Sequence, residues 1–429
     1  GRLCGLSQPL RAKLIRPKDM SHIVATIQGA SSAASLKAAH FLLFSVVRDS
    51  LEGAKAALDA GALTALAEQL ETLDPTVKAD ACWCLAAMAS HDAALAAAVA
   101  DGGGGACVGL LAQCVKEPSL PLKRIALSCL GCIGKHEQSL AEVLKKEGVH
   151  DAAAPLLKHR DPLVRRHACR LLALTCAQLD SIGHLPSATA DDAVSCIREA
   201  QHEKDVETGS FAAALLGQLA RRSPSFASAM RENDAAPALV SQLALAASSP
   251  VPAALALGYF CDAQPDVAPE LRRLGAVRQI KTQLDARPPP HVGAALCVPL
   301  GAMGAADARE ASEIAKCGAL HAAARATILG RRRPHAAGLG ATRTALCRAL
   351  ARCQEYTALS NIFLEMNMPA DPAAAPPTTR SVASGTATAR EAKERHVETE
   401  VLAALLRALA STFTARGSLR QDFQARGML

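Results

Sequence analysis

Residues 81–89 read ACWCLAAMA, and this stretch carries the pattern that decides the fold. Ala81, Leu85 and Met88 stand at offsets of four and seven, which places their side chains on one face of an α-helix. The same arrangement recurs along the chain, with a segment near Ala254 that fits poorly. The other sets are Ala39/Leu43/Val46, Ala126/Leu130/Ile133, Ala168/Leu172/Thr175, Ala212/Leu216/Leu219, Leu296/Leu300/Met303 and Leu346/Leu350/Cys353.

A second pattern precedes most of these segments, with Gly or Asp first and mostly apolar residues at offsets +2, +5 and +9. It is weakest after Gly148, where His150 takes the first apolar offset. Prolines, as in Asp74-Pro75 and Asp161-Pro162, separate the two patterns, and proline suits a helix start but not its middle. Each unit is therefore predicted to be a helix, a polar turn and a longer helix that stacks on its neighbours. The pattern starts, 41 to 44 residues apart, are Gly61, Gly105, Gly148, Asp191, Asp234, Gly275 and Gly318.

The composition favours helices and narrows the class of protein. Half of the 429 residues are apolar but only 3% are aromatic, so alanine and leucine supply most of the apolar surface. No apolar run reaches the roughly 18–20 residues of a membrane-spanning helix. The fifteen cysteines lie mostly in Ala/Leu-rich stretches, which predicts small buried side chains in a reducing compartment. A net charge of +7 suits an acidic partner better than nucleic acid.

A repeat near 42 residues with this layout resembles the armadillo repeat, and HEAT repeats are the nearest structural alternative. The resemblance implies an all-α protein, a right-handed armadillo-type α-solenoid superhelix. We expect a basic N-terminal arm over 1–20, a solenoid of about eight repeats over 21–368, and a disordered Pro/Ala/Thr linker over 369–390. A C-terminal amphipathic helix and tail are expected over 391–429.

One region resembles a narrower family. Leu122-Lys123-Arg124-Ile125-Ala126 leads to Ile133-Gly134-Lys135-His136, then to Ser139-Leu140-Ala141-Glu142-Val143 and Asp161-Pro162-Leu163-Val164-Arg165-Arg166. This phrase is similar to the sperm-associated-antigen armadillo proteins of the central pair of motile cilia. The match covers residues 120–170 and fades outside them, because other repeats lack the Lys-His pair.

No residues form a catalytic pattern, and we expect neither an enzyme nor a cofactor. The glycine run Gly102–Gly105 lacks the Lys-Ser/Thr of a phosphate-binding loop and falls at a repeat turn. Cys129 and Cys132 have zinc-like spacing but no second pair nearby, so core packing is the better interpretation and no metal is expected.

The candidate partner-binding residues are basic side chains and the single tryptophan. Residues 116–170 hold eleven Lys or Arg against six Asp or Glu, and the basic residues beside the long helices suggest a stripe for an acidic peptide; ordinary solvated charge pairs are an equal alternative. In peptide-binding armadillo proteins the position of Trp83 often faces the ligand, although packing between repeats explains it as well. The predicted set is Trp83, Lys123, Arg124, Arg165, Arg166 and Arg170.

These observations predict a protein-binding scaffold. The family resemblance implies a structural component of the motile-cilium axoneme, in the central apparatus. There it would bind axonemal proteins, or the acidic tails of tubulin, as part of a larger assembly, without nucleic acid or membrane. The alternative is a cytoplasmic or nuclear adaptor that binds peptide cargo or regulates a signalling enzyme. The residues four after the Trp83 position are Ala87, Cys132, Leu174 and Gln218, so the Trp/Asn ladder of nuclear-import adaptors is absent.

Overall fold

The computed structural model describes residues 14–30 and 32–323, and every regular element among them is a helix. The chain divides into unit 1, Gly1–Ala229, and unit 2, Met230–Leu429. The expected linker 369–390, the expected helix 391–429 and the last repeat segment around Leu346 lie outside the described residues. None of the described helices is long and apolar enough to cross a membrane.

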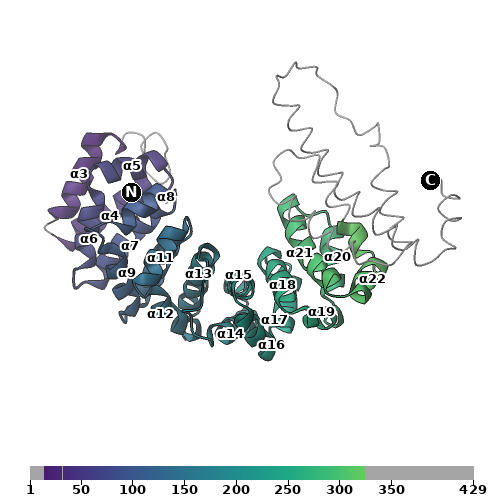
Figure 1. The fold of residues 1–429 in the computed structure, drawn as a ribbon. Helices are drawn as coiled ribbons and strands as arrows, with labels where there is room; N and C mark the ends of the chain where they lie inside the picture. Colours follow the sequence, from purple (N-terminus) through teal and green to yellow (C-terminus); the bar gives the residue numbers. More distant parts are fainter. Residues whose placement is uncertain (1–13, 31, 324–429) are drawn as a thin grey trace, which may run out of the picture. The chain divides into compact units, whose positions relative to one another are not determined.

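Unit 1 is a run of short and long helices that follow one another in chain order (Figure 1). Among the helices whose bounds are described, the earliest begins at Pro17, inside the stretch 1–20 predicted to be a basic arm. The elements are α3 (Pro17–Gln28), α4 (Ala33–Val47), α5 (Leu51–Asp59), α6 (Ala62–Leu70), α7 (Pro75–Ala89), α8 (Ala93–Ala100), α9 (Cys107–Lys116), α10 (Leu120–Gly134), α11 (Gln138–Lys146), α12 (Val149–Ala153), η1 (Ala154–Lys158), α13 (Pro162–Gln178), α14 (Thr189–Glu203) and α15 (Val206–Arg222).

Several repeats contain two short helices and one long helix, as in α5, α6 and α7, where the sequence pattern predicted two helices. The repeat that ends in α15 differs, because a single helix of 15 residues, α14, precedes it. We call the long last helix of each repeat its third helix; in unit 1 these are α4, α7, α10, α13 and α15. Each third helix packs against the next along the chain. The Gly that opens the second sequence pattern is the corner between the two short helices. Gly61 and Gly148 have φ of 81° and 68°, a left-handed conformation that strains other residues.

Asp-Pro pairs start third helices as predicted. Asp74 caps α7 by accepting a hydrogen bond from the Thr76 N–H, and Asp161 caps α13 by accepting one from the Val164 N–H. The proline occupies the first turn, where its missing N–H has no helical partner to lose. Behind these starts, the anchor residues Ala81 and Ala168 are fully buried, as the spacing predicted.

Two polar exceptions in the pattern bind each other. His150 replaces an apolar residue of the second pattern and Thr175 replaces one of the first, yet both are buried. His150 Nε2 lies 2.9 Å from Thr175 Oγ1, and His150 Nδ1 lies 2.8 Å from His184 Nε2. Because a buried polar group costs free energy unless it is hydrogen-bonded, the two exceptions are compatible only together.

Unit 2 explains why the segment near Ala254 fits poorly. It is a third helix, α18, but Gly258 stands where the pattern expects a large apolar side chain. A Cβ at Gly258 would lie 2.6 Å from Val298 Cγ1 of α21, so only glycine allows this approach. The elements of unit 2 are α17 (Ala235–Ala244), α18 (Val251–Ala263), η2 (Pro265–Val267), α19 (Ala268–Arg273), α20 (Ala276–Asp285), α21 (Pro290–Ala306) and α22 (Ala308–Lys316), and α16 (Pro224–Glu232) spans the boundary at residue 230.

The described cysteines are free thiols, and all but Cys317 are buried. This confirms that Cys82, Cys84, Cys129 and Cys169 are packed inside the helical array. Burial raises the pKa of the Cys84 and Cys176 thiols, to about 12 for Cys176, so these groups are neutral hydrophobes at physiological pH.

Candidate partner-binding surface

One position of the third helices faces outward in several repeats, two residues after the small anchor. We call this line of side chains the ladder row: Phe41, Trp83, Ser128, Arg170 and Ala214, on α4, α7, α10, α13 and α15. One pair of neighbouring positions is in contact, because Arg170 Nη1 donates a hydrogen bond of 3.0 Å to Ser128 Oγ. The row is therefore continuous across the boundary between the repeats of α10 and α13.

Large aromatic side chains occupy the first two positions of the ladder row. Phe41 is 47% exposed and Trp83 is 51% exposed, although the side chains on either side of Trp83 in α7 are buried. The Trp83 ring packs edge-on against Phe44, with ring centroids 5.7 Å apart. Large aromatic side chains exposed at equivalent positions of adjacent repeats make this end of the ladder row a candidate binding site.

Arg170 gives the ladder row a positive charge. Within the described part of the chain, its guanidinium donates hydrogen bonds to two neutral groups, Ser128 Oγ and, at 3.9 Å, Cys132 Sγ. No carboxylate among the described residues lies within ion-pair distance of it, and its side chain is partly exposed. Its charge is thus available to an incoming group.

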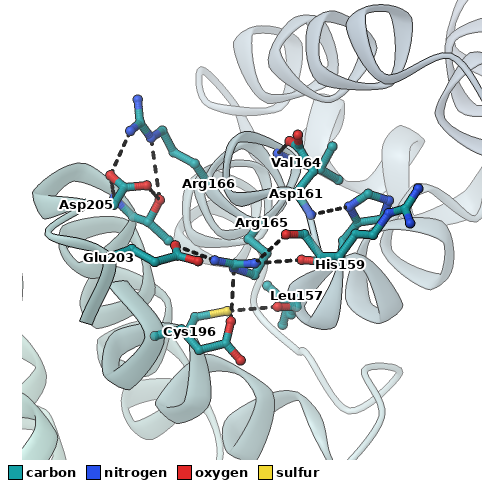
Figure 2. Close-up of polar contacts among 12 residues, drawn as sticks. Leu157, His159, Asp161, Val164, Arg165, Arg166, Cys196, Glu203 and Asp205 are labelled. Atoms are coloured by element: carbon teal, nitrogen blue, oxygen red, sulfur yellow. Dashed lines mark hydrogen bonds and ion pairs between the residues drawn. The ribbon is translucent and has the colours of Figure 1, made fainter. Parts of the chain in front are cut away.

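Three other predicted basic residues are bound to acids of the next repeat. We call them the clamp row: Arg124, Arg165 and Arg166. Arg124 pairs with Asp161, and Arg166 binds Asp205 at 2.7 Å and Glu207 at 2.6 Å. Figure 2 shows the Arg166–Asp205 contact beside Arg165.

Arg165 is the most deeply placed member of the clamp row, with 3% of its side chain exposed. Figure 2 shows its contacts with Glu203, at 2.5 Å, and with the carbonyl oxygen of His159. It also binds Glu199 at 3.2 Å and donates a hydrogen bond to the carbonyl oxygen of Arg160. The geometry makes Arg165 a connection between α13 and α14.

Lys123, the remaining basic residue of the predicted set, points into the protein. It is buried, and its Nζ donates a hydrogen bond of 2.6 Å to the carbonyl oxygen of Val115 at the end of α9. Burial lowers the pKa of Lys123. Of the six predicted residues, the structure thus brings Trp83 and Arg170 onto one exposed row and places the others between helices; whether any of them binds a partner stays a prediction.

Two of the acids that bind the clamp row are also N-terminal caps of helices. Asp161 caps α13 and Asp205 caps α15, and each carboxylate accepts hydrogen bonds from an arginine of the preceding third helix. Burial acts to raise the pKa of Asp205, but hydrogen bonds from Thr208 and Arg166 outweigh it and the pKa is lowered. The Arg-to-cap contact therefore joins α10 to α13 and α13 to α15 at the N-terminal ends of these helices.

The C-terminal ends of the third helices are joined as well, by contacts that the sequence did not predict. A side chain at or after the end of each third helix donates to a carbonyl at the end of the preceding one. The pairs are His91 to Val47 at 2.6 Å, His136 to Ala89 at 2.8 Å, Lys135 to Ser90 at 2.9 Å, Gln178 to Lys135 at 2.7 Å, and Arg222 to Ala177 at 2.8 Å. The sequence does carry a signal for these contacts, namely a polar residue at or just after the end of each third helix.

His167 lies among the arginines of both rows. Burial, and then the charges of Arg170, Arg166 and Arg124, lower the pKa of His167 to about 4. Its imidazole is therefore neutral at pH 7, and its Nδ1 is buried without a hydrogen-bond partner among the described residues. Burial is the main cause of the lowered pKa, and the neighbouring arginine charges add to it.

The cysteine pair considered for zinc is part of the core. Cys129 and Cys132 are buried in α10. No group of three or more His, Cys, Asp or Glu in residues 14–30 and 32–323 is arranged to hold a metal ion.

No protein-family model and no curated protein matches this chain. Solved structures match it in fold. An engineered protein, a structural-genomics target, covers 92% of this chain and 98% of its own at 17% identity, with a TM-score of 0.54. Another engineered target covers 57% of this chain and 97% of its own at 21% identity, with a TM-score of 0.50. A designed armadillo repeat protein in complex with the peptide (KR)4 covers 56% and 99% at 18% identity, with a TM-score of 0.49. The chain is an all-α, armadillo-type α-solenoid.

Proposed function

We propose that this chain is a non-enzymatic protein-binding scaffold and that the ladder row of unit 1 is its docking surface. The observation that carries the proposal is the exposure of Phe41 and Trp83 at equivalent positions of neighbouring repeats. Burying two such rings against a partner removes apolar area from water, and aromatic side chains contribute most of the binding energy in many interfaces.

We further propose that the scaffold is a structural component of the motile-cilium axoneme, in the central apparatus, with axonemal proteins or tubulin tails as partners. The support is the resemblance of residues 120–170 to the sperm-associated-antigen armadillo proteins. Within that phrase, Arg124 holds the following repeat, and Lys135 and His136 hold the preceding one. Because these residues fix the contacts between repeats, they also fix the positions of the ladder-row side chains.

The cellular half of the proposal is tested by fractionating ciliated cells. The protein is followed by immunoblot through detergent extraction and then a salt wash of the axonemes. Retention after detergent supports the axonemal assignment, and release by salt indicates an electrostatic attachment. Complete loss into the detergent-soluble fraction contradicts it and favours the adaptor function in the cytoplasm or nucleus.

The docking surface is tested with the purified full-length chain and salt-washed axonemes. Co-sedimentation of the wild type is compared with Phe41→Ser and Trp83→Ser variants, and with Leu73→Ser as a matched control. Leu73 is 99% exposed in the turn before α7, off the ladder row, so its loss removes exposed apolar surface elsewhere. Weaker binding by the two ladder-row variants alone supports the proposal, whereas equal binding by all four proteins contradicts it.

A further inference from the structure

The ladder row has an apolar end and a charged end. Phe41 and Trp83 form the first, on α4 and α7, and Arg170 forms the second, on α13. The other members, Ser128 and Ala214, have small side chains and offer little contact area to a partner. A partner lying along the row thus meets two chemically different points of contact with a short neutral stretch between them.

Arg170 is suited to bind an anion, unlike the clamp row. The charges of Arg124, Arg165 and Arg166 are neutralised by carboxylates of the next repeat. A guanidinium has five N–H donors, and the hydrogen bonds of Arg170 are to one hydroxyl and one thiol. A carboxylate binds a guanidinium through two parallel hydrogen bonds, which a neutral amide does not reproduce.

The separation between the two ends follows from helix packing. Trp83 and Ser128 stand on adjacent third helices, and packed helices lie about 8–10 Å apart. The Arg170 guanidinium lies within 3.0 Å of Ser128 Oγ on α10. Its distance from Trp83 is therefore only slightly larger than the distance between α7 and α10. An extended chain rises about 3.3 Å per residue, so the distance corresponds to about four residues.

We propose that the ladder row binds an extended peptide segment that places an apolar side chain against Trp83 and a glutamate or aspartate side chain on Arg170, about four residues away. This rests on the proposed docking function and adds the chemistry of the partner. The occupant is an acidic segment of a protein, because the hydrogen bonds of the Arg170 guanidinium are to a hydroxyl and a thiol and an anion complements its positive charge. The axonemal assignment is not needed for it.

Trp83 makes the test direct, because it is the only tryptophan in the chain and its fluorescence reports on the ladder row alone. Ten-residue Ser/Thr peptides carrying one Leu and one Glu at separations from two to seven residues, in either order, are titrated into the full-length protein. Affinity is expected to be highest at a separation of about four, and Glu→Gln in that peptide is expected to weaken binding about three- to tenfold.

The matched control lies one helical turn away on α13. Arg170→Gln is expected to abolish the preference for the Glu peptide over the Gln peptide, and Arg170→Lys to retain part of it. Arg166→Gln is expected to leave the preference in place, because Arg166 is already bound to Asp205 and Glu207. Circular dichroism of each variant checks that the helices remain folded.

Several outcomes would overturn the inference. They are equal affinity of the wild type for the Glu and Gln peptides, a preference for a Lys peptide, or no change in fluorescence up to about 1 mM of any peptide. Axoneme co-sedimentation separates this failure from failure of the proposed function. If axoneme binding requires Trp83 but not Arg170, the docking surface stands and the proposed carboxylate contact is wrong. If axoneme binding does not require Trp83, the docking surface itself is wrong.

Discussion

The clamp row and the ladder row run along the same third helices, yet they use the same residue type in opposite ways. Arg166 and Arg170 are one turn apart on α13. Arg166 is held by Asp205 and Glu207 of the next repeat, while Arg170 contacts only a hydroxyl and a thiol. A local excess of basic residues therefore does not give the charge that a partner meets. That charge depends on which basic residues are paired with acids about 40 residues farther along the sequence.

The largest expected effect comes from pH, which distinguishes the aspartates of the clamp row from the buried histidines of unit 1. Burial lowers the pKa of His40, beside Phe41, to about 4, and His150 and His167 have similar values for which burial is again the main cause. The ordinary value is 6.5. The unfolded chain therefore takes up protons as the pH falls below 6.5 while the folded chain does not, so stability is complete above 6.5 and is lost toward pH 4.

At pH 5 each of these histidines is expected to cost about 2 kcal/mol of the free energy of unfolding. The contacts of Asp161 and Asp205 in the clamp row are expected to persist over this range, because the pKa values of these two carboxyl groups are lowered. Urea unfolding at pH 7 and pH 5, followed by Trp83 fluorescence, measures the loss. In His40→Leu the loss is expected to shrink by one histidine's share; an unchanged loss contradicts the assignment.

The next largest effect is expected from Arg165→Met. This change leaves Glu199 and Glu203 without their cation and removes the donors to two carbonyl oxygens. Breaking a buried pair is strongly destabilising, but the two glutamates remain partly in water, so about 2 to 3 kcal/mol is expected. Chemical denaturation checks this, and stability equal to the wild type would mean that the contact does not hold α13 to α14.

A smaller effect isolates one Arg-to-cap contact. Asp205→Ala removes both the cap of α15 and the partner of Arg166, and it is expected to destabilise the protein by about 1.5 kcal/mol. Asp74→Ala is the matched variant, because Asp74 caps α7 through Thr76 and no arginine pairs with it in the described part of the chain. Thermal unfolding is expected to place Asp74→Ala closer to the wild type, and the reverse order would count against the clamp.

The smallest effect on stability is expected at the ladder row. Arg170→Gln loses hydrogen bonds to Ser128 and Cys132 only, and a change of less than about 0.5 kcal/mol is expected in the same denaturation assay. A loss as large as that of Arg165→Met would place Arg170 among the structural residues and remove the basis for its role in binding.

Much of the fold could be predicted because its signals are local. Alanine anchors, Asp-Pro helix starts and corner glycines act within one turn of the chain, and the structure confirms them at Ala81, Asp161-Pro162 and Gly61. The pattern did not predict the glycine at position 258, because Val298 of another helix fills the space that a large side chain would occupy there. The predicted basic stripe was less informative, because the partners of Arg165 and Arg166 lie 34 to 41 residues away in the sequence and periodicity does not reveal such pairs.

The contacts at both ends of the third helices have a mechanical consequence. To bend unit 1 in either sense, neighbouring third helices must separate at one end or the other. Separation strains the Arg-to-cap contacts at one end, as between Arg166 and Asp205, or the side-chain-to-carbonyl contacts at the other, as between Gln178 and Lys135. From α10 to α15 the third helices are thus connected at both ends, so that load applied at one repeat passes to the next instead of opening a single boundary.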